Sequence, residues 1–522
     1  MFPRDSSCPT LVSALTGAAV LLAVVVAVQC SGGDSHGRPN VILVTMDTTR
    51  PDYLSCYGQR QNPTPHLDAL AREGVRFELA LSASAVTPVS HASILTGLFP
   101  YEHGLRVLSA GSGFRLPQEQ RTVASVMREA GYTTGAVHSA FPVSGYFGFD
   151  RDYDHFDSLD GALTVRHGDT KTSWDSRTLQ RRSDETTDLC LEFIREAQQE
   201  DRPFFLWVHY WDPHDPTLKP PREFTSNLAL PDGGLAANSG AYEELYAAEV
   251  RYLDQQFGRL LAGLREMGLA DDTLVAVTAD HGEGLADGYE RHGWGKHRMT
   301  YQEQLHVPLI LNGPGIPAGG VVPDMVRTVD IVPTLLDYAG LAWELEGYSG
   351  RSLRPLIEGR TLPTAVAYAD QINGYDANAS MVGMRPDAAY LYTVCDGDWK
   401  LTYRPHMPER SELFQLSVDP HEEHNVLAEE REVYLRLMAD LAGRNPWVLA
   451  PFPDDGSLDP DVASGLQQLG YAESGSNAES LWWWTCPAHP DYRRATRESD
   501  TGSRRHASDG CQQPVVVRTQ WR

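Results

Sequence analysis

The chain has 522 residues, of which 41% are hydrophobic and 22% charged, and its formal net charge is −26 at pH 7. A chain of this length and composition buries a sizeable core, with room for one large domain and a smaller one. The acidic excess argues against a nucleic-acid partner, because phosphate backbones reward clustered lysine and arginine. It leaves room for a small anionic substrate, since a metal ion or a few local cations can reverse the field inside one cleft.

The N-terminal segment has the pattern of an export signal. After Arg4, an apolar run over residues 11–28 is followed by small polar residues. We therefore predict a signal peptide over residues 1–30 and an exported protein, in the periplasm or cell envelope. Cys30 suggests a lipoprotein site that would attach the protein to a membrane, although Gln29 is unusual before such a cysteine. An uncleaved anchor helix is the alternative, because about 18 apolar residues is near the lower limit for spanning a bilayer.

Four short apolar segments have the length and β-branched or aromatic content of strands. They are residues 40–46, 204–210, 273–279 and 307–313. None alternates cleanly between apolar and polar residues, so each is predicted to be buried on both faces, as in a parallel sheet covered by helices. Helical patterns lie between them, over residues 64–74, 122–131 and 241–268. Strands alternating with helices predict an α/β doubly wound fold with a mostly parallel sheet.

The composition changes twice towards the C-terminus. The main α/β domain is predicted over residues 38–360, and the shorter, broken apolar segments over 361–474 indicate a small α+β subdomain with antiparallel strands. Residues 475–522 are rich in serine and arginine and have no periodicity. We predict that this last segment is a disordered tail.

Three of the predicted strands end on side chains that bind metals or carry protons. The first leads to Asp47, the second to His214, and the third to Asp280 and His281. Each has an ordinary explanation alone, since an aspartate after a strand often caps a helix. Ligands of parallel sheets, however, bind beyond the carboxyl ends of the strands, where these side chains would meet. Two carboxylates and one imidazole suit one divalent cation, Ca²⁺, Mg²⁺, Mn²⁺ or Zn²⁺, although at least one more ligand is needed.

Thr87, at the start of the segment TPVSHASILTG, has two interpretations. Its hydroxyl could cap a helix that has Pro88 at its first position. It could also be a further metal ligand and a nucleophile. A threonine hydroxyl attacks poorly at neutral pH, but its alkoxide becomes accessible beside a dication at a helix N-terminus, which also favours an anion. The two roles are compatible.

The segment HGWGKH follows the third strand and contains His292, Lys296 and His297. A lone lysine would be assigned to the solvated surface. Here Lys296 lies between the predicted metal ligands and the next strand, among glycine, aromatic and histidine residues. We predict that this group of cation and imidazoles binds the substrate's oxyanion, and that Lys296 takes part in protonating its leaving group.

Between about Pro39 and Glu473 the chain resembles the sulfatase family of the alkaline-phosphatase superfamily. The shared segments are NVILVTMDTTRPDYL, TPHLDALAREGVRF, SHASILTG, FPYEHG, TADHGEG, WGKH and ELFQLSVDPHEEHNV. The resemblance implies an alkaline-phosphatase-like fold. It puts Asp47, Asp280 and His281 at the family's metal-ligand positions and Thr87 at the nucleophile. It also puts His214 and Lys296 against the substrate, where we assign them catalytic roles.

The chain departs from the family pattern at the groups that handle sulfate. Sulfatases have Cys or Ser at the nucleophile, within a C/S-x-P-S-R motif, and convert it to formylglycine. Here the motif is Thr87-Pro88-Val89-Ser90-His91, so neither convertible residue is present, and His91 stands where Arg is expected. We predict that His91 binds substrate. Thr48 replaces a second Asp, and Ser139 and Phe141 replace the family's sulfate-gripping Lys and His.

These departures change the expected chemistry. A formylglycine hydrate has a second hydroxyl that expels bound sulfate, whereas a threonine adduct must be cleared by water attacking the central atom. That second displacement is normal for phosphoryl-threonine, and the chain resembles nucleotide pyrophosphatase/phosphodiesterases and lipoteichoic-acid synthases in pairing Thr with a metal. We expect a metal-dependent hydrolase of small anionic esters, such as glycan or lipid-headgroup esters, with phosphate (di)esters favoured over sulfates. The alternatives are a true sulfatase that works without formylglycine and a non-catalytic binder of anionic glycans.

Overall fold

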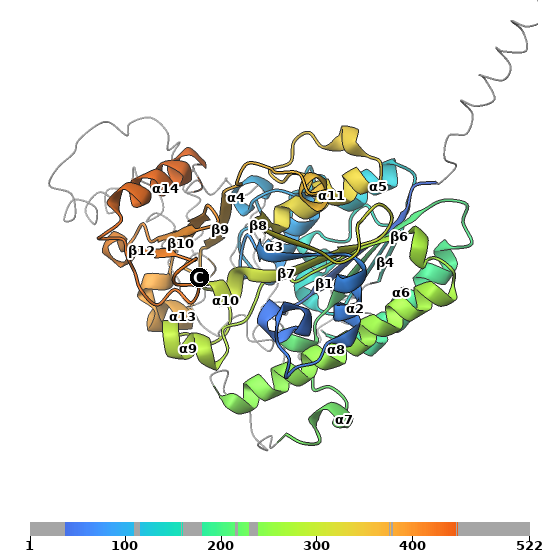
Figure 1. Cartoon of the computed structure of the whole chain (residues 1–522), viewed down its shortest axis with the longest axis horizontal. Coiled ribbons are helices and arrows are strands. Elements are labelled where there is room, and N and C mark those ends of the chain that lie inside the picture. Colours follow the sequence, from blue (N-terminus) through green and yellow to red (C-terminus); the bar gives the residue numbers. More distant parts are fainter. Residues whose placement is uncertain are drawn as a thin grey trace, which may run out of the picture. The chain divides into compact units, whose positions relative to one another are not determined.

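A computed structural model describes residues 37–108, 115–157, 159, 180–214, 218–228, 239–374, 376, 379–444 and 446 (Figure 1). Its helices and strands belong to the second of two units, Asn40–Arg522. The predicted signal peptide (1–30) and tail (475–522) lie outside the described residues and stay predictions. None of the helices in the described ranges combines the length and apolar character needed to cross a membrane.

An eight-stranded sheet forms the centre of this unit, in the order β4-β3-β5-β1-β6-β7-β2-β8. The strands are β1 (Asn40–Met46), β2 (Val75–Leu81), β3 (Thr133–His138), β4 (His155–Asp157), β5 (Phe204–Tyr210), β6 (Thr273–Thr278), β7 (His306–Asn312) and β8 (Gly320–Arg327). Strands β4, β3, β5, β1 and β6 are parallel to one another, and β2 is parallel to β8. The predicted α/β fold with a mostly parallel sheet is therefore confirmed.

Strand β7 differs from the expectation of a further parallel strand, because it is antiparallel to both β6 and β2. The segment between β6 and β7 contains no helix that crosses back over the sheet. Its residues instead fold against the end of β6, where the amide of Gly282 donates to the carbonyl of Gln304 over 2.9 Å. The chain therefore enters β7 from the edge at which β6 ended, and β7 must run in the opposite direction.

Helices cover both faces of this sheet (Figure 1). On β1, Val41 and Leu43 contribute to one apolar core, whereas Ile42 and Val44 contribute to the other. The first core includes residues of α3 (Thr87–Thr96), α5 (Val123–Glu129) and α11 (Ile331–Tyr338). The second includes residues of α2 (Pro65–Glu73), α6 (Ser183–Ala197) and α8 (Gly240–Glu266). Burial on both faces explains why the central strands are apolar without alternation.

The predicted helices are present, with one difference at a helix start. Thr122 caps α5 as its pattern indicates, and its side chain accepts a hydrogen bond from the Ser125 amide. Thr64 precedes α2 but makes no side-chain cap, because its hydroxyl instead accepts the Ser55 amide at 3.0 Å. The shorter helices are α4 (Pro100–His103), α7 (Arg222–Thr225), α9 (Ala286–His292), α10 (Gln302–Leu305), α12 (Arg354–Ile357) and α13 (Ala379–Met384).

A second, antiparallel sheet lies in the predicted C-terminal subdomain, in the order β12-β11-β10-β9. Its strands are β9 (Ala367–Gln371), β10 (Leu391–Cys395), β11 (Trp399–Tyr403) and β12 (Glu412–Gln415), and α14 (Arg431–Arg444) packs on β10 and β11. Strand β9 contacts the segment before α3, where the amide of Asp370 donates to the carbonyl of Ala83 over 3.1 Å. The small sheet therefore supports the loop that leads into Thr87.

Candidate active site and metal centre

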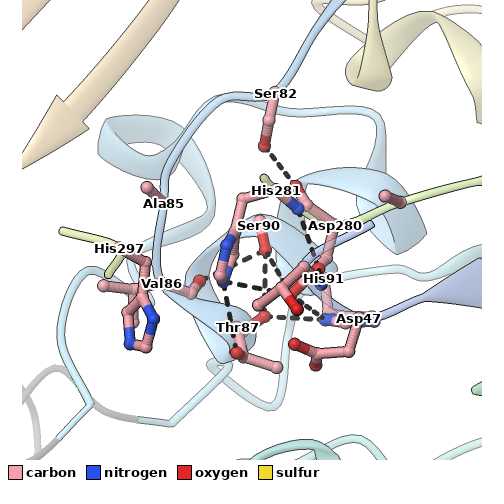
Figure 2. A network of polar contacts seen from close by, with 12 residues as sticks. Asp47, Ser82, Ala85, Val86, Thr87, Ser90, His91, Asp280, His281 and His297 are labelled. Carbon is pink, nitrogen blue, oxygen red and sulfur yellow. Dashed lines mark hydrogen bonds and ion pairs between the residues drawn. The ribbon is translucent and has the colours of Figure 1, made fainter. Parts of the chain in front are cut away.

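The side chains of Asp47, Thr87, Asp280 and His281 converge at the carboxyl edge of the large sheet (Figure 2). Asp47 follows β1 and Asp280 follows β6, and these two strands are paired. Ligand atoms of Asp47, Asp280 and His281 all lie within 4.8 Å of one another. Thr87 Oγ1 lies 3.3 Å from His281 Nε2, and all four side chains are fully buried. The structure thus brings together the four residues predicted to hold the cation, whose roles stay predictions.

Thr87 is the first residue of α3, and its N-cap is Val86. Pro88 therefore occupies the second helical position rather than the first. The alternative in which Thr87 caps the helix is wrong, because its hydroxyl is directed to His281 instead of to the amides of the first turn. Proline after Thr87 still shapes the helix start, since its ring fixes the backbone and its missing amide would have been unpaired there.

In each of the two carboxylates, the shorter hydrogen bonds go to one oxygen. Asp47 Oδ2 lies 3.1 Å from Nε2 of His209, whereas Asp47 Oδ1 is buried and has no hydrogen-bond partner among the described residues. Asp280 Oδ1 accepts the amides of Thr48 at 3.0 Å and His281 at 2.8 Å. Burial, together with the carboxylates of Asp280 and Glu283, raises the pKa of Asp47. A buried, unpaired carboxylate oxygen beside further negative charge is what a divalent cation would compensate, so these residues fit the metal that the family pattern implies.

Thr48 replaces the second Asp of the family pattern and contributes through its backbone. Its φ is +49°, an unfavourable conformation for a β-branched residue. This conformation is what directs its amide to Asp280 Oδ1. Strain at Thr48 is therefore coupled to the orientation of a predicted metal ligand.

His91 lies beneath Thr87 rather than in an open pocket. Its Nδ1 lies 2.7 Å from the carbonyl oxygen of Thr87 and its Nε2 lies 3.1 Å from Thr45 Oγ1. The side chain is fully buried, and burial lowers its pKa. With both ring nitrogens bonded inside the protein, His91 is in a position to support Thr87, and the substrate-binding role predicted for it finds no support in this geometry.

His214 and His297 extend the site outward from His281. The ring of His297 lies 5.3 Å from that of His281 and 5.2 Å from that of His214. His214 stacks on Trp211 at 3.8 Å. Burial lowers the pKa of both outer histidines, and neighbouring positive charges, Lys296 included, lower it further. Both rings are therefore neutral at pH 7, whereas Lys296 is exposed to solvent and supplies positive charge.

His292, predicted with Lys296 and His297 as one group, lies elsewhere. It is the last residue of α9, its Nδ1 lies 2.7 Å from Glu303 Oε1, and its ring stacks on Tyr301 at 3.6 Å. Its Nε2 contacts the carbonyl oxygen of Glu422 at 3.3 Å. The substrate-binding role predicted for His292 is not supported, because the turn after α9 separates it from the residues that follow.

Two residues that support the site were given no role by the sequence. His209 orients Asp47 from within β5. Gln371, at the end of β9, accepts hydrogen bonds from Ser84 Oγ at 2.7 Å and from the Ala85 amide at 3.0 Å. The position of His209 at the end of a buried strand was a usable signal. Gln371 had none, because its partners are far away in the sequence.

Known families match most of the chain. The family described as sulfatase matches residues 39–341, and the family described as N-sulphoglucosamine sulphohydrolase, C-terminal, matches residues 290–444. An N-acetylglucosamine-6-O-sulfatase of Bacteroides thetaiotaomicron is 25% identical over 480 residues, covering 74% of this chain and 82% of the relative. Human arylsulfatase A is 28% identical over 498 residues, and the match covers 83% of this chain and 91% of the human protein.

Solved structures share the fold. One, in complex with its substrate D-glucosamine-2-N,6-O-disulfate, has a TM-score of 0.62 at 22% identity and covers 78% of this chain and 97% of its own. The phosphonate monoester hydrolase of Agrobacterium radiobacter has a TM-score of 0.59 at 24% identity and covers 78% and 96%. At these identities the likeness establishes the architecture.

Proposed function

We propose that this chain, which belongs to the sulfatase family and is a hydrolase of sulfate or phosphate esters, uses Thr87 as its nucleophile. The observation that carries the proposal is the position of Thr87 Oγ1, 3.3 Å from His281 Nε2 in the cluster with Asp47 and Asp280. A threonine that served only the helix would not direct its hydroxyl into a group of metal ligands.

Asp47, Asp280, His281 and Thr87 would hold the divalent cation. When bound, the cation would lower the pKa of the Thr87 hydroxyl, so that its proton is lost to solvent, and would offset negative charge on the ester. The same four groups are fully buried, so they have little contact with bulk water. Their burial strengthens every electrostatic interaction with the ester.

The reaction has two displacements. Thr87 Oγ forms a bond to the central phosphorus or sulfur, and the bond to the leaving oxygen breaks with a proton supplied by Lys296. Water then forms a bond to the same atom, the bond to Thr87 Oγ breaks, and the proton of the water passes to the bulk. The positive end of the α3 dipole favours the anionic ester bound at Thr87. Neutral His214 orients this ester by hydrogen bonding.

The side chains at the positions of the family's sulfate-gripping residues differ from the Lys and His that the family uses. Ser139 Oγ is committed to Thr186 Oγ1 and to the carbonyl of His209, both at 2.6 Å. Phe141 is buried among aromatic rings, including Phe147 at 5.5 Å. Neither position offers a cation to sulfate. Threonine also lacks the second hydroxyl that expels sulfate, so we place phosphate diesters and phosphonate monoesters ahead of sulfate esters, a preference consistent with the phosphonate monoester hydrolases among the fold relatives.

Turnover of three matched aryl esters, a phosphodiester, a phosphonate monoester and a sulfate, tests the preference directly. We expect the phosphorus esters to be hydrolysed with the higher kcat/KM. Rapid quenching and intact-mass measurement should detect a phosphoryl or phosphonyl adduct on the wild type and none on Thr87→Ala. Hydrolysis of the sulfate alone would establish the true sulfatase instead, as the names of the curated relatives suggest.

The proposed setting is outside the cytoplasm. The signal over residues 1–30 and lipidation at Cys30 carry this part of the proposal, with a small glycan or lipid-headgroup ester as substrate. Expression of the full chain in a bacterium with labelled fatty acid would test it. Cleavage before Cys30 with incorporation of label is expected, and an uncleaved, unlabelled cytosolic protein would contradict it.

A further inference from the structure

We infer that the cation centre of Asp47, Asp280 and His281 selects a transition metal that binds imidazole, of the class of Mn²⁺, Co²⁺ and Zn²⁺, over Ca²⁺ and Mg²⁺. The inference rests on the proposed function only in taking this cluster as the metal centre. It is carried by the way in which surrounding groups leave one atom of each ligand directed to the cluster.

The imidazole of His281 is held with its Nε2 towards the other ligands. Nδ1 lies 2.8 Å from the carbonyl oxygen of Gly282, and a carbonyl only accepts, so Nδ1 carries the proton of the neutral ring. Nε2 then presents its lone pair to Thr87 Oγ1 at 3.3 Å. Asp280 Oδ2 also lies 3.3 Å away, beyond the 2.7–2.9 Å typical of a charge-assisted hydrogen bond. The nitrogen is therefore preset as a ligand.

In each carboxylate, one oxygen is held more tightly by the protein than the other. The Ser139 amide donates to His209 Nδ1 over 3.3 Å, so His209 Nε2 carries the proton and donates to Asp47 Oδ2. Asp47 Oδ1 remains. Asp280 Oδ1 accepts two amides, whereas Oδ2 has only longer contacts, 3.3 Å to His281 Nε2 and 3.5 Å each to Ser90 Oγ and His91 Nδ1. Cation binding through both oxygens of either carboxylate would compete with these hydrogen bonds, so binding through one oxygen of each is favoured.

The resulting donor set is one nitrogen and three single oxygens, the third being Thr87 Oγ1. Within the described ranges, no other carboxylate, thiol or imidazole joins the three residues in a cluster this tight. Ca²⁺ prefers six to eight oxygens, often from bidentate carboxylates, and Mg²⁺ prefers oxygen ligands and retained waters. A site with one imidazole nitrogen and few oxygens suits Co²⁺ and Zn²⁺. These ions bind a given set of ligands more tightly than Mn²⁺ does. The set therefore favours Zn²⁺ and Co²⁺ first, then Mn²⁺.

Calorimetric titration of the metal-free, full-length protein with each ion separately tests this selectivity. We expect one equivalent of Zn²⁺ or Co²⁺ to bind on the order of 100-fold more tightly than Ca²⁺ or Mg²⁺. X-ray absorption of the Zn²⁺-loaded wild type should show an imidazole in the metal's shell. Calcium binding as tight as that of Zn²⁺, or a bound Zn²⁺ without imidazole, would overturn the inference. Neither measurement requires a variant to fold.

The substitution His281→Asn sharpens the test, because it replaces the ring nitrogen by an amide oxygen. Zn²⁺ and Co²⁺ affinities should fall by about 100-fold or more, with Ca²⁺ affinity unchanged or increased. The matched control is His424→Asn, since the His424 side chain is 79% exposed and its affinities should be those of the wild type. Equal losses for all ions in His281→Asn would contradict selectivity through nitrogen.

These measurements use no substrate, so the two proposals fail separately. If the protein binds Zn²⁺ through His281 but hydrolyses none of the three esters, the metal inference stands and the proposed function is wrong. If the protein hydrolyses these esters with Ca²⁺ bound tightly, the proposed function stands and the metal inference is wrong.

Discussion

Two buried histidine–carboxylate clusters lie close together in the sequence and have opposite electrostatic character. In one, His292 Nδ1 lies 2.7 Å from Glu303, and Nε2 faces the carbonyl of Glu422. Burial alone would lower the pKa of His292 and raise that of Glu303, but their mutual hydrogen bond reverses both directions. Each partner stabilises the charge of the other. This cluster is complete without any ligand.

The other cluster is incomplete. Nε2 of His281 lies 3.3 Å from both the Thr87 hydroxyl and Asp280 Oδ2, and burial and neighbouring carboxylates raise the pKa of Asp47. Negative charge is therefore concentrated there without an equal positive charge. Burial costs free energy in both clusters, and in the second an added cation would offset that cost. In this chain, the two histidine–carboxylate clusters differ in whether the protein itself compensates their charge.

The substitution Thr87→Ala should have the largest effect on the incomplete cluster. Loss of a nucleophile that acts together with its neighbours should lower kcat by about 10⁴-fold or more. Steady-state hydrolysis of the best aryl ester measures it. Thr361→Ala, at an exposed position, is the matched control and should behave as wild type. Turnover retained in Thr87→Ala would show that another group attacks, whereas ligand binding with no wild-type turnover would favour the non-catalytic binder.

Lys296→Met should come next, because it removes the exposed cation assigned to the leaving oxygen. We expect kcat/KM to fall by about 10²–10³-fold. The melting temperature should stay unchanged, since an exposed lysine contributes little to stability. Lys219→Met, also exposed, provides the matched control. Equal kcat/KM values for both variants would remove Lys296 from the mechanism.

Addition of a divalent cation should stabilise the folded protein through the incomplete cluster and not through the complete one. A cation at 100 times its Kd should raise the free energy of unfolding by about 2.7 kcal/mol. Urea unfolding of the metal-free protein, with and without Zn²⁺, measures the gain. Asp280→Asn should abolish the gain, and Glu303→Gln, in the complete cluster, should retain it even though that protein starts less stable. A gain that survives Asp280→Asn would place the cation elsewhere.

His292→Gln should have the smallest effect, and one that depends on pH. The pKa of His292 is raised above its ordinary 6.5 in the folded protein, so its contribution is fully present below that value and is lost as pH rises through the raised value. We expect a loss of about 2 kcal/mol at slightly acidic pH and a smaller loss in alkali. Urea unfolding of both proteins at two pH values measures this loss of stability. A loss that increases with pH would contradict the expected effect.

Local patterns were sufficient to identify most of the predicted cation centre. Unbroken apolar runs predict β1, β5 and β6, because a strand buried on both faces needs apolar residues throughout. Since parallel strands end at one edge, the order of residues along the chain is enough to group Asp47, Asp280 and His281. Thr87 was added as a further ligand by its place at a helix start, and the family resemblance, confirmed by the matches over most of the chain, put it at the nucleophile position.

Contacts between distant segments decided the remaining features. The reversed direction of β7, the support of the Thr87 loop by Gln371, and the different surroundings of His281 and His292 depend on which segments meet in space. A residue's type and spacing state which bonds it can make. Whether a histidine nitrogen meets a carboxylate, a carbonyl or a hydroxyl is settled only by packing, because those partners come from elsewhere in the chain and burial makes each of them costly to leave unpaired.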